Sequence, residues 1–336
     1  MSEASPSALS QPGLLLATRR DRAAALAIVA LCFIAASAAP LAVYAIALAV
    51  FGLAHVGVEL RFVDRAFAGR LPKGFVLGVA AAVALAAVAR ILGQIKTLAP
   101  TTAVMLELGA GAAMACIALA FMRRRRAFAA IALAILVAGT VFAPWPTFLA
   151  LAIGHNLTPL AFAADAAAPR ARARLLAWLS GPFVILPLVI ASGLPADFFA
   201  RLGLYAPEAA PLAVGSLDAN LPAYVPLSLL DTDWAAPMFS ACVFAQTMHY
   251  AAVIHLLPRL VGDAPRATLA PWPRQNVFVV LIALAAAALA FVFVLDYALA
   301  RKIYAVAALV HAWVEIPILL LALDRRNPSE AETGRS

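Results

Sequence analysis

Long apolar stretches recur along almost the whole chain, separated by short breaks rich in proline and arginine. Each stretch is about 17–25 residues long, which is the length that a helix needs to cross the hydrocarbon core of a bilayer. The pattern therefore predicts an all-α, polytopic membrane helix bundle of about ten transmembrane helices. The predicted spans cover residues 22–38, 41–62, 74–92, 102–122, 127–143, 146–164, 175–194, 236–258, 275–296 and 302–323.

The composition excludes a water-soluble globule. Of the 336 residues, 65% are hydrophobic and 12% are charged, whereas soluble domains carry about 25% charged residues. The mean hydropathy is +0.95. The net charge of +8 comes from short basic clusters between the apolar stretches, so we interpret it as a topology signal. Membrane lipids are the expected surroundings, and nothing indicates nucleic acid as a partner.

The basic clusters predict that both termini are cytoplasmic, because cytoplasmic loops retain lysine and arginine during insertion. We expect a disordered cytoplasmic lead over residues 1–20, a single transmembrane helical domain over 21–324 and a cytoplasmic tail over 325–336. The connection over 195–235 is expected outside, and its first part could lie along the interface as an amphipathic helix. The connection is either a lid over a lipid-facing entrance or a solvated loop. Cytoplasmic connections would contain Arg61, Arg65, Arg70, Lys73, Arg123 to Arg126, Arg170, Arg172, Arg174, Arg259, Arg266, Arg274, Arg325 and Arg326, leaving Lys96, Arg201, Arg301 and Lys302 outside.

All five histidines fall inside predicted spans, where ionisable side chains are costly and mark a functional site by default. His55, His155, His249 and His311 lie roughly 9 to 14 residues from the outer ends of helices that run in the same direction. At about 1.5 Å per residue these four imidazoles share nearly the same depth and could converge on one ion. His255 follows His249 by six residues, which turns it by roughly 240° to another face, so we leave it out of the site.

Two glutamates follow histidines by four residues, which places each pair on one helix face: Glu59 after His55, and Glu315 after His311. A carboxylate at the bilayer centre costs about 2.5–3.5 kcal/mol unless it is paired or bound to a metal. Either glutamate binds an ion directly or accepts the hydrogen bond that orients a ligating histidine, and the sequence is compatible with both roles. A histidine-rich site with open positions in an apolar cavity suits non-haem Fe(II) working with O₂. The predicted metal ligands are His55, His155, His249 and His311.

Other polar residues near these positions have more ordinary interpretations. Asn156, Gln246 and Tyr250 are neighbours of the histidines that could donate hydrogen bonds around the site. Glu107 is expected to be an interfacial or helix-pairing carboxylate. The chain has no glycine-rich phosphate loop, no His-Glu-x-x-His box and no nucleophile elbow.

Four short motifs follow one another along the chain: Ala-His55-Val-Gly-Val-Glu59, Gly-His155-Asn156, Met-His249-Tyr250 and Val-His311-Ala-Trp-Val-Glu315. In motif order and membrane class the chain resembles the bacterial membrane dioxygenases of the Brp/Blh kind, which cleave β-carotene centrally to retinal and use histidine-bound iron. Glu59 stands where that family has aspartate, His155 is not in a His-Phe-Gly motif, and five residues instead of three separate His249 from His255. The resemblance implies Fe(II), O₂, a carotenoid or isoprenoid substrate and a place in the bacterial inner membrane.

The leading hypothesis is an integral-membrane non-haem iron oxygenase that holds one ion through its four histidines and acts on a lipophilic substrate entering from the lipid. A second class is a haem-binding electron-transfer protein with two facing histidines as axial ligands. A third class is a proton-coupled transporter that uses His/Glu pairs as relays. A purely structural subunit also stays open at this point.

Overall fold

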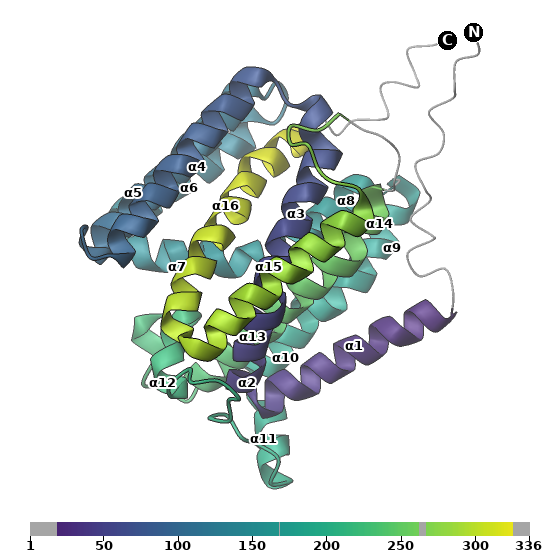
Figure 1. Cartoon of the computed structure of the whole chain (residues 1–336), viewed down its shortest axis with the longest axis vertical. Helices are drawn as coiled ribbons and strands as arrows, with labels where there is room; N and C mark the ends of the chain where they lie inside the picture. The colour runs from purple at the N-terminus through teal and green to yellow at the C-terminus, as the bar shows by residue number, and fades with distance from the viewer. Residues whose placement is uncertain (1–18, 168, 262–266, 325–336) are drawn as a thin grey trace. The chain divides into compact units, whose positions relative to one another are not determined.

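The structure, a computed structural model, describes residues 19–167, 169–261 and 267–324 (Figure 1). These residues fold almost entirely into helices, and no strand lies among them. Within these ranges eight helices are long and apolar enough to cross a membrane, or nine if one bent pair counts as a span. The chain is therefore a multi-pass helical membrane protein. The predicted tail and all but the last two residues of the predicted lead lie outside the described residues.

The helices follow one another with short connections. In chain order they are α1 (Arg19–Ala38), α2 (Pro40–Ile46), α3 (Gly52–Phe67), α4 (Lys73–Gln94), α5 (Pro100–Phe121), α6 (Arg126–Phe142), α7 (Pro144–His155), α8 (Thr158–Ala166), α9 (Pro169–Ser180), α10 (Leu186–Ala191), α11 (Leu194–Arg201), α12 (Leu217–Asn220), α13 (Ala235–Ala251), α14 (Leu257–Val261), α15 (Gln275–Leu295) and α16 (Tyr297–Asp324). Three π-helical segments, Ala47–Phe51, Gly181–Ile185 and Ala252–Leu256, join α2 to α3, α9 to α10 and α13 to α14.

All ten predicted spans are helical in the structure, with π turns included. The span predicted over 146–164 is not continuous, because α7 and α8 meet at a 43° bend. Pro159 accounts for the break, because proline lacks the backbone N–H that a continuous helix needs and is favoured in the first turn of a new helix. Helix α6 has 17 residues, at the short end of what crosses a bilayer. The number of crossings thus stays a prediction, and so does the location of the termini.

Contacts between Cα atoms divide the chain into two compact units, and the first consists of Met1–Ala66 and Asn156–Arg301. Helix α13 is the core of this unit, with most of its side chains buried, and α1, α2 and α10 pack against it (Figure 1). Two of the π-helical segments lie next to histidine positions: Ala47–Phe51 precedes His55, and Ala252–Leu256 follows His249. Such π turns inside α-helices occur frequently at functional sites.

Some charged residues that were predicted in connections lie inside helices of this unit. Arg61 belongs to α3, is buried, and donates a hydrogen bond to the carbonyl of Pro273 (3.2 Å) while its guanidinium covers the Phe278 ring. Arg301 belongs to α16, which begins earlier than predicted because Asp296 caps it by accepting a hydrogen bond from the backbone N–H of Leu299 (2.9 Å). The side of the membrane on which these two arginines lie stays a prediction.

The second unit consists of Phe67–His155 and Lys302–Ser336. Helices α4, α5 and α6 lie side by side in it (Figure 1). Lys302, predicted in an outer connection, lies within α16. The turn between α5 and α6 is tied to the end of α16, because the Asp324 carboxylate accepts hydrogen bonds from three consecutive backbone N–H groups at 2.7–2.8 Å, those of Arg123, Arg124 and Arg125.

The predicted connection over 195–235 contains two helices and several tight turns. Helix α11 begins it, with Phe199 buried and Phe198 57% exposed, which is the amphipathic pattern expected for its first part. Ser216 caps the N-terminus of helix α12, because its hydroxyl accepts a hydrogen bond from the backbone N–H of Ala219 (3.3 Å). Its assignment to the outside of the membrane stays a prediction.

Candidate metal centre

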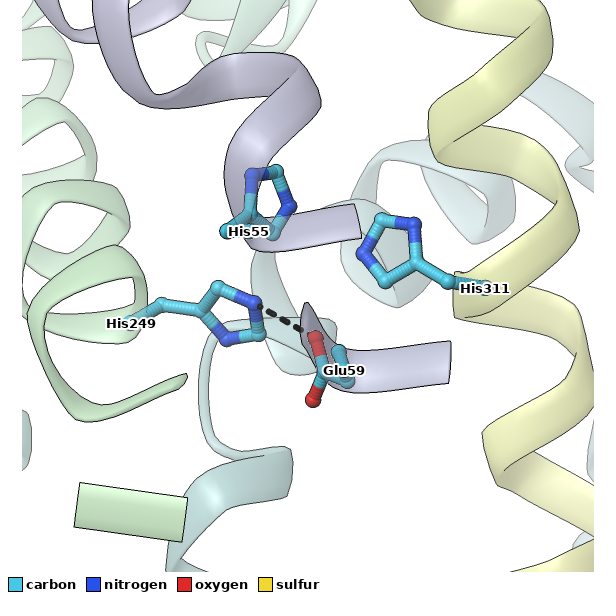
Figure 2. Close-up of side chains that lie close together, drawn as sticks. All are labelled: His55, Glu59, His249 and His311. Carbon is cyan, nitrogen blue, oxygen red and sulfur yellow. Dashed lines mark ion pairs between the residues drawn. The ribbon is translucent and has the colours of Figure 1, made fainter. Parts of the chain in front are cut away.

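The first unit contains a buried triad of His55, Glu59 and His249. His55 and Glu59 lie one turn apart on α3, and His249 lies on α13 (Figure 2). All three side chains are at most 1% exposed. Nε2 of His249 is 3.3 Å from Oε2 of Glu59, and the rings of the two histidines meet edge to face at 5.4 Å between centroids. One donor atom from each residue lies within 4.8 Å of the others, so this group could hold a metal ion.

The ring of His55 has a defined tautomer in this geometry. Its Nδ1 is 3.2 Å from the carbonyl oxygen of Phe51, the last residue of the π-helical segment. Because a carbonyl only accepts, Nδ1 donates its hydrogen, and Nε2 is left with the lone pair that a metal ligand needs. A backbone carbonyl that fixes the non-ligating nitrogen is common around metal-binding histidines.

The second unit contains a matching triad of His155, His311 and Glu315. His155 ends α7 at the bend, whereas His311 and Glu315 lie one turn apart on α16. Nε2 of His155 is 2.9 Å from Nε2 of His311, and Nδ1 of the same ring is 3.1 Å from Oε2 of Glu315. His311 and Glu315 are buried, and the side chain of His155 is 16% exposed. One donor atom from each residue again lies within 4.8 Å of the others.

One contact in each triad has the separation of neighbouring metal ligands. Two donor atoms that bind one ion at about 2.0–2.1 Å are about 2.8–3.4 Å apart when they occupy adjacent tetrahedral or octahedral positions. The contacts of His249 Nε2 with Glu59 and of His155 Nε2 with His311 Nε2 are 3.3 and 2.9 Å. His155 meets Glu315 through its other nitrogen, Nδ1, at 3.1 Å, so this contact is not one between two ligands of the same ion. Imidazole nitrogens with a carboxylate suit iron, manganese or zinc. The donor atoms and their spacing therefore fit a transition metal.

Electrostatics favours a cation at these positions. Glu59 is completely buried and Glu315 is 1% exposed, and an ionised carboxylate at such depth needs a partner of opposite charge or neutralisation. A divalent ion bound beside imidazoles supplies positive charge without requiring a protonated histidine. Each triad offers such an ion one carboxylate and two neutral nitrogens.

The fifth histidine, His255, lies outside both groups. His255 belongs to the π-helical segment after α13 and is exposed. Among the described residues, the clusters that could hold an ion do not include it. The neighbours of the histidines are also placed: Asn156 is buried at the bend after α7, and the Gln246 amide lies 2.6 Å from the hydroxyl of Tyr250 within buried α13.

The second unit contains a buried ion pair, of which the sequence analysis named only the carboxylate, Glu107. Glu107 on α5 is 2% exposed and accepts two hydrogen bonds from Arg90 on α4, at 2.6 and 2.7 Å. It also accepts a hydrogen bond from Nε1 of Trp313 on α16 (3.0 Å). Glu107 thus pairs helices, as expected. Arg90 was missed, although a charged residue inside the apolar stretch over 74–92 was a signal that could have found it.

No protein family, curated protein or solved structure matches this chain.

Proposed function

We propose that this chain is an integral-membrane non-haem iron oxygenase or dioxygenase that acts on a lipophilic substrate. The supporting observation is that Glu59 and Glu315, both buried, each contact a histidine nitrogen within a group of two imidazoles and one carboxylate. A histidine-rich donor set with a carboxylate and an open coordination position suits non-haem Fe(II) working with O₂. Bound Fe(II) would supply the binding and activation of O₂.

In this proposal the residues of the chain have distinct roles. The matched depth of the four histidines in the sequence is the reason to assign His55, His155, His249 and His311 to one ion. Glu59 lies beside Nε2 of His249 and is assigned as a direct ligand. Glu315 contacts Nδ1 of His155, whose other nitrogen faces His311, and is assigned to orient that ring.

The surroundings support a lipophilic substrate. The first triad is buried between apolar helices, and the helices of the chain expose large aliphatic and aromatic side chains as lipid-facing helices do. A molecule dissolved in the bilayer reaches such a site without crossing water. The carotenoid or isoprenoid class and the bacterial inner membrane come from the motif resemblance, and they are part of the proposal on that ground alone.

Proton-coupled transport is a second candidate, favoured by one contact. His155 lies between Glu315 and His311, at 3.1 and 2.9 Å, so three proton-exchanging groups form a row. Axial ligation of haem has less support, because two imidazoles on opposite faces of one iron need about 4 Å between their nitrogens. The 2.9 Å separation of the His155 and His311 nitrogens is too short for that arrangement.

Oxygen uptake by the detergent-purified protein separates these functions. We expect iron without a porphyrin absorption band, and O₂ consumption when a carotenoid is supplied in mixed micelles. His255→Ala is the matched control, because it removes an exposed histidine next to the helix that carries His249. Iron with no O₂ uptake on any apolar substrate would refute the oxygenase. A porphyrin band would select the haem protein, and a metal-free protein that dissipates a pH gradient in vesicles would select transport.

A further inference from the structure

Tyr250 packs face to face on the proposed ligand His55. The ring centroids are 4.0 Å apart and the planes differ by 25°, so the phenol covers one face of the imidazole. Both side chains are buried, with Tyr250 3% exposed. Tyr250 follows His249 directly on α13, whereas His55 lies on α3. The stack therefore joins the two helices that carry the histidines of the first triad.

The position of the phenol ring is itself fixed. The amide of Gln246, one turn earlier on the same helix, is 2.6 Å from the Tyr250 hydroxyl. Gln246 is 5% exposed, so this polar pair lies in the protein interior. A buried, hydrogen-bonded phenol cannot swing away from the imidazole without breaking that bond.

His55 thus has two supports with different effects. The Phe51 carbonyl holds Nδ1 and selects the tautomer. The stack with Tyr250 restricts rotation of the ring about its Cβ–Cγ bond, which determines the direction in which Nε2 points. On α13 the proposed ligand His249 is followed directly by the supporting Tyr250, and Gln246 lies one turn before Tyr250.

We propose that Tyr250, held by Gln246, is a positioning residue that sets the ring plane of His55 and so the geometry and affinity of the metal centre. This inference rests on the proposed function, because it requires His55 to be a metal ligand. Outer partners that orient ligands typically change metal affinity about 10- to 100-fold when they are removed. The phenol covers the His55 imidazole, and its ring also meets the ring of His249 edge to face at 6.0 Å between centroids, so it acts on the ion through these imidazoles.

Co²⁺ added to the metal-depleted protein in detergent tests the proposal, with affinity read by chelator competition and geometry by the visible ligand-field spectrum. Tyr250→Leu removes the stack, and Tyr250→Phe keeps it while removing the hydroxyl. Phe244→Leu is the matched control, because Phe244 is a fully buried aromatic residue on α13 whose ring contacts Phe33. Thermal unfolding of each variant measures the purely structural effect.

We expect Tyr250→Leu to weaken Co²⁺ binding about 10- to 100-fold and to shift the ligand-field bands. Tyr250→Phe should stay within a few-fold of the unaltered protein, and Phe244→Leu should lower only the unfolding temperature. An unaltered spectrum and affinity in Tyr250→Leu would overturn the positioning role alone, as would equal shifts in Phe244→Leu. Failure of the unaltered protein to bind Co²⁺, Fe²⁺ or Zn²⁺ would overturn the proposed function together with this inference.

Discussion

Replacement of Arg90 by leucine isolates the energetics of the buried ion pair in the second unit. The guanidinium donates two hydrogen bonds to Glu107, from Nε at 2.7 Å and from Nη2 at 2.6 Å, and its side chain is 21% exposed against 2% for the carboxylate. The substitution leaves Glu107 with the Trp313 indole N–H as its remaining described donor. An ionised carboxylate would then be buried with no positive charge beside it.

Arg90→Leu should lower the free energy of unfolding strongly, and its effect should not add to that of a substitution at Glu107. Breaking a buried ion pair by removing one partner costs about 3–5 kcal/mol, and the partial exposure of Arg90 puts the expected cost near the lower end, at about 3 kcal/mol. Glu107→Gln keeps an acceptor for the Trp313 indole and leaves an arginine that can extend toward water. We therefore expect it to lower the free energy of unfolding by about 1–2 kcal/mol. The double variant should lose at least about 1 kcal/mol less unfolding free energy than the two single variants lose together.

Reversible unfolding in mixed micelles with increasing dodecyl sulfate measures these free energies. Arg126→Leu is the matched control, because Arg126 is exposed at the start of α6 in the same unit. The reasoning is refuted if Arg90→Leu destabilises the protein no more than Arg126→Leu. It is also refuted if the two single effects add in the double variant, since additivity would mean that the charges do not stabilise each other.

Two further predictions concern the packing of a glycine and the loop whose backbone and indole N–H groups bond to Asp64. Gly111→Ala should lower the free energy of unfolding by about 1–3 kcal/mol, because a Cβ there would overlap the Trp313 ring; Gly109→Ala, where the Cβ meets open space, should be neutral in the same titration. Asp64→Ala should cost about 2–4 kcal/mol, because the carboxylate accepts three hydrogen bonds at 2.7–3.0 Å, including one from the Trp272 indole. Tryptophan fluorescence should shift to the red in that variant, and an unchanged emission maximum would contradict it.

The helices were predictable because membrane insertion demands long apolar stretches, and their ends depend on local signals that the sequence contains. The 43° bend after His155 was not predicted, although Pro159 was visible, because apolarity continues through the break. The start of α16 at Tyr297 was missed, because the cap by Asp296 starts the helix before the basic residues that flank the apolar span.

The sequence places four histidines at matched depth but does not tell which side chains meet. Burial depth along each helix follows from residue counting, and the four-residue spacing of His55 and Glu59 fixes their shared face. The contacts of His249 with Glu59 and of His155 with His311 depend on how helices rotate against each other, which counting does not determine. The contact with the Phe51 carbonyl was not foreseen either, because residues 41–62 were predicted as one regular span and the structure has a π-helical segment there.

The most direct test of the account is the iron content of the purified protein and of three variants, measured by elemental analysis after loading with Fe(II) and removal of free metal. The account predicts about one iron per chain in the unaltered protein and in His255→Ala, and loss of iron in His55→Ala and His311→Ala. Equal iron in all four proteins, or none in the unaltered protein, would contradict it.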